Sequence, residues 1–271
     1  MNNFKKQLLD NNELHLEIPI TFDCNLKCKN CKNFSNIINE HIEYPLKTFK
    51  SDIEYLNKIN ANLKSVIIYG GEPLLNKNLF EYINIIRLIY NNRCKINILT
   101  NGVRLDTSDE FIDNLLRTDT HICVNVYPPF KDKVENIIKF YKSKGVLIHK
   151  TNNEIDNAEI QVNDKFRKTK FRINNPKDQE IQFNKCKGDF LNLFMSNFYV
   201  CSVNMNVKHV NKRYNSNFKY SFKSIYDFNS NSDIVDFCKT SSELCKFCFM
   251  PYNDYEQYKR VPQFKIDFYE Y

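Results

Sequence analysis

Residues 14–31 read LHLEIPITFDCNLKCKNC, an apolar run followed at once by three cysteines. Leu14 to Phe22 is apolar with few polar interruptions, which predicts a first β-strand. The cysteines then form a loop with the spacing C-x3-C-x2-C: Cys24, Cys28 and Cys31. Three thiolates from one short loop can ligate three irons of a cubane and leave the fourth iron open to a small molecule.

Zinc is the alternative for this loop, because soft sulfur ligands select either iron–sulfur clusters or zinc. A closed zinc site requires four ligands, and His41 could supply the fourth. The C-x3-C-x2-C order directly after a strand is unusual for zinc. The spacing therefore favours the iron–sulfur cluster.

Helical and strand patterns alternate from the cysteines to about residue 150. Apolar runs predict strands at 66–69, 96–100, 122–127 and 146–148, and helical spacing predicts helices near 46–56, 79–90, 111–116 and 134–141. Such alternation forces parallel strands with right-handed crossovers, in either a barrel or an open doubly wound sheet. In both architectures the chemistry belongs at the carboxyl ends of the strands.

Three motifs fall at such strand ends. Besides the first cysteine group, they are Gly70-Gly71-Glu72-Pro73 after the second strand and Asn101-Gly102 after the third. Because all three lie on one predicted face, we expect them to form a single site.

A second cysteine group lies in the C-terminal half. Cys245 and Cys248 form a C-x2-C chelate, Cys201 ends the second strand of a hairpin predicted over 191–203, and Cys186 precedes that hairpin. A metal ion or cluster bound by these four thiolates would hold a small, loop-rich segment together. Either an iron–sulfur cluster or zinc fits this pattern, and Cys238 on the helix predicted over 233–238 could replace one of the four ligands.

The first motifs resemble the radical S-adenosylmethionine (SAM) superfamily. The resemblance rests on Cys24, Cys28 and Cys31 after the first strand together with Gly70-Gly71-Glu72-Pro73 after the second. It implies a [4Fe–4S] cluster whose open iron binds SAM, and a 5′-deoxyadenosyl radical that abstracts a hydrogen atom from substrate. It further implies that the glycine-rich strand end meets the SAM amino group. Asn101, after the third strand, and Asn125 are further candidates for contact with SAM. Asn125 shares one face of the fourth strand with Cys123 and Tyr127, so it could touch SAM if that face lines the barrel interior, and ordinary barrel lining is the alternative. Asn30 stands where the family usually has an aromatic residue that touches adenine.

The second cysteine group is similar to the short "twitch" form of the SPASM domain found behind radical SAM barrels. This resemblance implies one auxiliary [4Fe–4S] cluster. The expected fold is α/β: a partial parallel barrel over 12–165, a small hairpin-plus-helix domain over 180–255 and a tail over 256–271. The four auxiliary ligands would be Cys186, Cys201, Cys245 and Cys248.

An auxiliary cluster gives a substrate radical an acceptor for its remaining electron, which indicates a two-electron oxidation. The layout resembles that of the twitch-type aminocyclitol dehydrogenases. We therefore expect alcohol dehydrogenation on a small polyhydroxylated molecule, such as a sugar or nucleotide-sugar, with electrons from flavodoxin or ferredoxin. Candidate bases for the hydroxyl proton are Lys150, His149 and Arg172.

Two other functions fit the same motifs. A radical SAM peptide maturase would form a thioether, a crosslink or an epimer, although such enzymes often carry an N-terminal leader-binding domain and only about a dozen residues precede the first strand here. A non-catalytic zinc or electron-transfer protein would use the cysteines without SAM cleavage.

The composition sets further bounds. The 271 residues and 42% hydrophobic content suffice for one large domain, and ten cysteines in a reducing compartment indicate metal rather than disulfides. The formal charge of +7 falls to roughly +4 with two clusters bound. No signal peptide, membrane-length apolar run or RNA-binding module is visible, which predicts a cytoplasmic enzyme that acts on small molecules rather than nucleic acids.

Overall fold

The computed structural model describes residues 11–28, 31, 33–150, 165–167, 176–186, 191–248 and 255–257. Two of the predicted site residues, Asn30 and Arg172, lie outside this described part of the chain. Lys150 is described by its backbone alone.

An eight-stranded sheet forms the centre of the molecule, with the order β5-β4-β3-β2-β1-β7-β8-β9. Strands β1 to β5 are parallel to one another, as the alternating patterns predict. Their bounds are β1 Leu14–Thr21, β2 Leu63–Gly70, β3 Lys95–Thr100, β4 Thr120–Val124 and β5 Ile148–Lys150.

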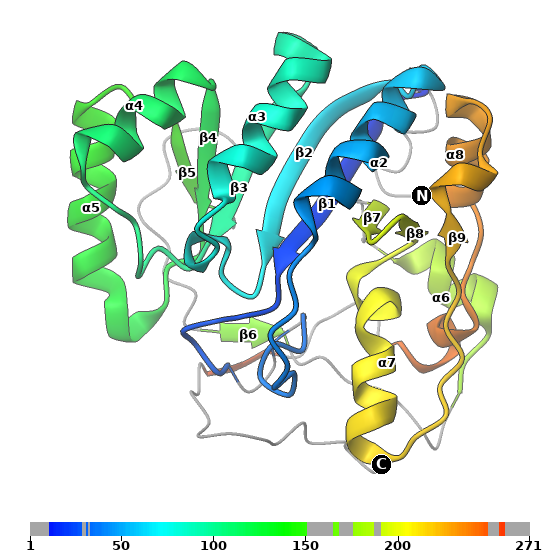
Figure 1. The fold of residues 1–271 in the computed structure, drawn as a ribbon. Coiled ribbons are helices and arrows are strands. Elements are labelled where there is room, and N and C mark those ends of the chain that lie inside the picture. The colour runs from blue at the N-terminus through cyan, green and yellow to red at the C-terminus, as the bar shows by residue number, and fades with distance from the viewer. Residues whose placement is uncertain are drawn as a thin grey trace.

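The helices between these strands lie along one face of the sheet (Figure 1). They are α2 Leu46–Lys58, α3 Leu79–Tyr90, α4 Asp109–Arg117 and α5 Lys131–Ser143. Because strands 1 to 5 are spatial neighbours in chain order, each right-handed crossover returns over the same face. This decides between the two architectures that the sequence allows: the sheet is a partial barrel, open at both edges, and not a doubly wound sheet.

Alternate side chains of β1 build the core under these helices. Leu14, Leu16, Ile18 and Ile20 are each 0% exposed. On α3, the predicted apolar face of Leu79, Ile83, Ile86 and Tyr90 is buried against them. Each fully buried aliphatic side chain contributes about 1.5–3 kcal/mol, so this two-layer core dominates the stability of the barrel half.

The C-terminal half extends the same sheet rather than starting a new one. Strand β7 (Leu191–Phe194) pairs in parallel with β1, and the antiparallel strands β8 (Asn197–Tyr199) and β9 (Lys223–Ser224) follow it. The predicted hairpin is therefore present but ends earlier than residue 203, because Ser202 already begins helix α7 (Ser202–Tyr214). Helix α7 was not predicted, although Val203, Val207 and Val210 recur at helical spacing.

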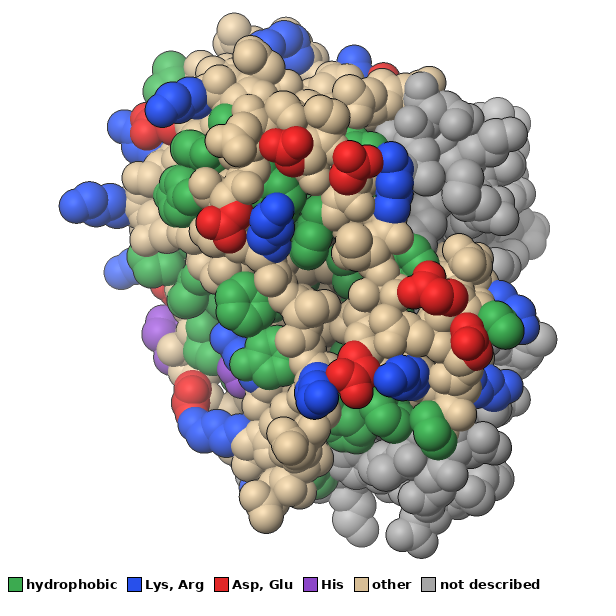
Figure 2. Space-filling model, turned by 90° about the vertical axis from the view of Figure 1, so that its right-hand side faces the viewer, with side chains coloured by type: hydrophobic (Ala, Val, Ile, Leu, Met, Phe, Trp, Pro, Cys, Tyr) green, Lys and Arg blue, Asp and Glu red, His purple; other side chains and the backbone are tan. Residues whose placement is uncertain are grey.

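Two shorter helices complete this half: α6 (Gln179–Lys185) and α8 (Asn231–Cys238). Helix α8 confirms the predicted helix near 233–238, and Ser230 caps it in a capping box with Asp233. The outer face of this half mixes positive and negative side chains with scattered apolar groups (Figure 2). A separate pair of short antiparallel strands is formed by β6 (Lys165–Arg167) and β10 (Tyr255–Gln257).

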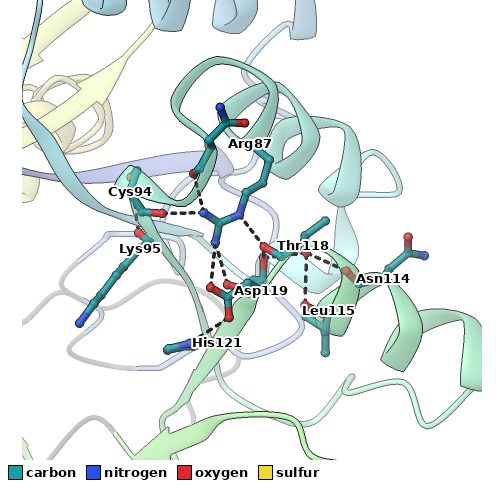
Figure 3. Close-up of polar contacts among 10 residues, drawn as sticks. Arg87, Cys94, Lys95, Asn114, Leu115, Thr118, Asp119 and His121 are labelled. Atoms are coloured by element: carbon teal, nitrogen blue, oxygen red, sulfur yellow. Dashed lines mark hydrogen bonds and ion pairs between the residues drawn. The ribbon is translucent and has the colours of Figure 1, made fainter.

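A single arginine closes the amino-terminal edge of the barrel strands. The Arg87 guanidinium donates to the carbonyls of Asn91, Cys94, Thr118 and Asp119, as Figure 3 shows for the last three. These carbonyls belong to the turns before β3 and β4, and the fork of five N–H donors suits several acceptors at once. Cys94 is completely buried here, at the edge opposite the strand ends that carry the motifs, which supports a packing role for its thiol.

Candidate functional site

The first cysteine loop leaves β1 at Thr21 and folds back on itself. The Leu26 amide donates to the Cys24 sulfur at 3.3 Å, and the Lys27 ammonium donates to the Ser35 carbonyl at 3.0 Å. Cys28 is buried, whereas Cys24 and Cys31 are partly exposed. The loop therefore holds its cysteines on a locally bonded backbone at the carboxyl end of the first strand.

The glycine motif packs directly against this loop. The Gly71 amide donates to the Thr21 carbonyl at 2.8 Å, and the Glu72 amide donates to the Asp23 carbonyl at 2.7 Å. A Cβ atom on Gly71 would lie 2.2 Å from the Asp23 carbonyl oxygen, so only glycine permits this approach. In this structure Gly71 thus serves the packing of two strand ends against each other.

Glu72 joins the second strand end to the third. Its carboxylate is 0% exposed and accepts from the Thr100 hydroxyl at 2.7 Å and the Asn101 amide at 2.8 Å, and also from the Leu74 amide at 3.2 Å. Burial raises the pKa of Glu72 to about 7, and the three hydrogen bonds oppose that rise. Buried Pro73 follows and opens a short 3-10 turn.

Asn101 links the third strand end back to the cysteine loop. Its side-chain amide donates to the Asn25 side-chain oxygen at 2.8 Å. The backbone amide of Asn125, after β4, donates to the Thr100 carbonyl at 2.9 Å. The structure therefore brings together the three motifs that the sequence placed at strand ends, with Asn125 beside them.

The first cysteine loop fits a cluster ligated by thiolates. Burial raises the pKa of the Cys24 thiol to about 12, and the nearby Cys31 thiol raises it further, so deprotonated sulfurs there require a cation. Within the described ranges, no three His, Cys, Asp or Glu side chains gather around one point as a single metal ion requires. His41 instead faces Asp23, with 2.5 Å between its Nδ1 and a carboxylate oxygen, and its side chain is 69% exposed. This geometry does not support His41 as a zinc ligand.

The second cysteine group comes from three separate elements. Cys186 ends α6, Cys201 caps the first turn of α7 through its sulfur, and Cys245 and Cys248 lie in and just after a 3-10 turn over 243–247. Burial raises the pKa of Cys201 to about 12, with smaller contributions from the thiols of Cys186, Cys248 and Cys245. The four sulfurs are thus electrostatic neighbours, whereas Cys238 lies on α8 against the hydrophobic core.

Polar contacts hold these elements together. The Lys177 amide donates to the Lys246 carbonyl at 2.9 Å, and the Gln179 side chain donates to the Ser241 hydroxyl at 2.7 Å. Both contacts join the segment that carries Cys186 to the segment that carries the C-x2-C pair. The second group is therefore a product of tertiary contacts rather than of one loop.

Asp52 on α2 anchors the hairpin of β7 and β8, which lies between Cys186 and Cys201 in the sequence. Its buried carboxylate accepts from the Ser196 amide and hydroxyl, both at 2.9 Å, and from the Tyr226 hydroxyl at 2.7 Å, besides the Tyr44 hydroxyl. Ser196 has a φ of +62° and Met195 of +45°, a left-handed pair that usually requires glycine or asparagine. The carboxylate compensates for the missing glycine, a role the sequence analysis did not detect because the contact spans 144 residues.

Of the three predicted base candidates, the structure describes the side chain of one, His149. His149 is exposed on β5, and its ring lies 5.7 Å from the His121 ring. Cys123 is half-buried on the same face of the sheet, with its sulfur 3.8 Å from the Asn97 side-chain oxygen. The side chain of Lys150 and all of Arg172 lie outside the described residues, so their role as bases stays a prediction.

Comparison with known proteins identifies the family. The sequence profile of the Radical SAM superfamily matches residues 18–156, which include both strand-end motifs and the cysteine loop. The chain belongs to the radical SAM superfamily. It is an enzyme of the type that binds SAM and a [4Fe–4S] cluster, and its mixed α/β sheet has the partial-barrel form expected of that family.

Curated relatives match part of the chain. A probable GTP 3′,8-cyclase of Methanococcus aeolicus is 39% identical over 101 residues, which cover 36% of this chain and 33% of the relative. A 7-carboxy-7-deazaguanine synthase of Clostridium acetobutylicum is 32% identical over 80 residues, 29% of this chain and 34% of the relative. The chain therefore spans about a third of the length of these relatives.

One solved structure matches almost the whole chain. It is BtrN in complex with AdoMet and 2-DOIA, with a TM-score of 0.52 and 18% identity over 90% of this chain and 96% of BtrN. At this identity the likeness concerns the fold, and it extends beyond the barrel half.

Among the described residues, no helix combines the length and apolarity needed to cross a membrane.

Proposed function

We propose that this radical SAM enzyme is a dehydrogenase that oxidises an alcohol of a small polyhydroxylated molecule. The observation that carries the proposal is a set of four cysteines on docked segments behind a radical SAM barrel: burial raises the pKa of half-buried Cys201, and the thiols of Cys186, Cys248 and Cys245 add to that rise. The fold likeness to BtrN over both halves supports the same layout. BtrN was solved with AdoMet and 2-DOIA, which makes a ring with several hydroxyl groups the first substrate class to test.

In this proposal Cys24, Cys28 and Cys31 hold the SAM-cleaving cluster, and the second cysteine group holds an auxiliary [4Fe–4S] cluster. When bound, SAM and the two clusters supply a 5′-deoxyadenosyl radical that takes a substrate hydrogen atom, and an acceptor for the electron that the substrate radical then loses. Gly70, Gly71, Asn101 and Asn125 lie at the strand ends beside the first loop, where SAM would lie, and the buried carboxylate of Glu72 joins two of these strand ends. A low-potential flavodoxin or ferredoxin would supply the reducing electron.

The proton balance assigns a further task to the protein. Loss of one hydrogen atom and one electron from an alcohol leaves a hydroxyl proton, which a side chain or water must accept before the ketone is complete. Lys150, His149 and Arg172 remain candidates for that acceptor. The net product is a ketone two daltons lighter than the alcohol.

Anaerobic reconstitution tests the proposal directly. The protein is loaded with iron and sulfide, reduced with dithionite and incubated with SAM and 2-deoxy-scyllo-inosamine deuterated at its ring carbons. The proposal expects deuterium in 5′-deoxyadenosine and a ketone product in equal amounts. Two results together would rule out the dehydrogenase: 5′-deoxyadenosine forms without deuterium, and every tested polyol is recovered intact. The family assignment would remain unchanged.

A further inference from the structure

The first cysteine loop ends in a tight turn that carries the side chain of Asn33. The Phe34 amide donates to the Cys31 carbonyl at 3.0 Å, which closes the turn directly after the last cysteine. Phe34 has a φ of +56° and is buried in the hydrophobic core, so it holds the turn in place. Asn33 is partly buried, and its side-chain amide donates to the Gly70 carbonyl at 3.0 Å, across 37 residues of sequence. The turn therefore joins the end of the loop to the end of β2.

The carbonyl that Asn33 binds belongs to a closely packed strand end. Gly70 is buried and has a φ of +152°, a conformation that side chains other than glycine rarely adopt. A Cβ atom there would lie 1.9 Å from the Thr21 carbonyl oxygen, so Gly70 lies in direct contact with the end of β1. The strand end is thus fixed on the sheet, and Asn33 connects the loop to a fixed point.

Three consecutive residues of the glycine motif hold both ends of the cysteine loop. At its start, the amides of Gly71 and Glu72 donate to backbone carbonyls of the loop. At its end, the Gly70 carbonyl accepts from Asn33. All three cysteines of the first group lie between these two attachments. The bonds at the start join backbone to backbone, so side-chain substitutions in the loop leave them in place, whereas the attachment at the end depends on one side chain.

The separation between the loop and the strand end matters for a molecule that lies beside both. A cluster ligated by the three thiolates of the loop has its open iron on the loop side, whereas Gly70 lies on the strand side. Binding sites of this kind must hold their groups to within about 0.5 Å of the productive geometry. A hydrogen bond that fixes the last cysteine of the loop relative to the strand end therefore acts on the geometry of the SAM site without itself contacting SAM.

We propose that Asn33 is a positioning residue for SAM, because its bond to the Gly70 carbonyl holds the end of the cysteine loop at a fixed distance from the strand end. This inference goes beyond the dehydrogenase proposed above, since it concerns the binding of SAM and not the substrate that is oxidised. Loss of the Asn33 amide should weaken SAM binding while the three thiolates continue to ligate the cluster.

The test measures SAM affinity by equilibrium dialysis of labelled SAM against the oxidised, reconstituted holoenzyme, in which no electron is available for cleavage. Asn33→Leu nearly conserves the volume and removes the amide, so its Kd for SAM should rise about tenfold, with iron per chain unchanged. Asn33→Gln keeps the donor and should stay within about threefold of the wild type. Asn62→Leu is the matched control, since the Asn62 side-chain amide also donates to a backbone carbonyl, that of Asn12 at 3.1 Å, before β2 begins. This control should bind SAM normally, and urea should unfold it and Asn33→Leu at similar midpoints.

Three outcomes would overturn the proposal. One is an unchanged SAM affinity in Asn33→Leu. A second is a loss of iron in Asn33→Leu, which would make the side chain part of cluster retention. A third is a SAM affinity that falls as far in Asn62→Leu or in Asn33→Gln as in Asn33→Leu. SAM binding that depends on Asn33 without oxidation of any polyol would keep the positioning role and refute the dehydrogenase, whereas polyol oxidation with a SAM affinity indifferent to Asn33 would do the reverse.

Discussion

The two cysteine groups differ in how the chain brings them together. Cys24, Cys28 and Cys31 lie within one loop of eight residues, and the backbone of Gly71 and Glu72 fixes the start of that loop through two hydrogen bonds. The second group comes from the end of α6, the start of α7 and the turn over 243–247. The first group is therefore a local feature supported by strand ends, and the second exists only when distant segments have docked.

This difference has consequences for function and stability. Damage to the first group should remove chemistry without unfolding the protein, because the sheet beneath it is independently packed. Damage to the second should affect the oxidation of substrate and the docking of α6, α7 and the C-x2-C turn together. Four changes test this contrast, in order of decreasing effect.

Cys24→Ala should abolish SAM cleavage, with a loss of at least about a thousandfold, because an open-iron cubane needs all three thiolates of the loop. Iron content should fall by about half while the second cluster is retained. The measurements are 5′-deoxyadenosine formation and iron per chain after reconstitution. Cys94→Ala is the control, since Cys94 is a cysteine that lies at the opposite edge of the sheet, where it is buried. Equal activity in Cys24→Ala and wild type would contradict the assignment of the first group.

Cys201→Ser should distinguish the functions of the two cysteine groups most clearly. Serine can replace the cysteine sulfur as the cap of the Asn204 amide, so α7 should remain folded. We expect about half of the iron to be lost, 5′-deoxyadenosine formation to persist and ketone formation to stop. Cys238→Ser, on α8, should leave all three quantities unchanged. Full iron content in Cys201→Ser, or loss of iron in Cys238→Ser, would require a different ligand set.

Asp52→Asn should weaken the docking of the hairpin on α2. The carboxylate accepts hydrogen bonds from four donors. In asparagine an NH2 group replaces one of the two oxygens, and this group donates where an acceptor is needed. The expected cost is about 2–4 kcal/mol in the free energy of unfolding, measured with urea. Glu54 is exposed on the same helix and, among the described residues, forms an ion pair with Lys50 at 3.8 Å, so Glu54→Gln should cost less than about 0.5 kcal/mol. Equal effects of the two variants would show that the hairpin does not depend on Asp52.

The free energy of unfolding should depend modestly on pH through Glu72, which lies beside the first cysteine group. Its pKa is raised to about 7 in the folded state, above the ordinary value of 4.5, so between these pH values the unfolded chain loses a proton that the folded chain keeps. Stability should therefore fall as pH rises from about 5 to 7 and level off above that, by up to about 3 kcal/mol. Urea unfolding of the metal-free protein measures the slope. Glu72→Gln should flatten it, and an unchanged slope in that variant would assign the effect to another group.

Much of the barrel half was predictable from the sequence. The apolar runs of β1 to β4 and the helical spacing of α2, α3 and α5 are local signals, and the structure confirms each element to within a few residues. The convergence of Cys24, Gly71 and Asn101 was also predictable, because parallel strands place their carboxyl ends at one edge. The early end of the hairpin and the presence of α7 were not predicted, since the valines of α7 are separated by polar residues whose partners lie elsewhere in the fold.

The sequence by itself determined which residues carry chemistry: thiolates at characteristic spacings and glycines where a strand must end close to another chain segment. These depend on covalent spacing and local backbone geometry, which a linear pattern records. Only the tertiary structure decided that helices cover one face of the sheet, that β7 joins β1, and that Asp52 stabilises a left-handed turn 144 residues away. Those outcomes follow from long-range packing and from the solvation of buried polar groups, which depend on neighbours that the order of residues does not reveal.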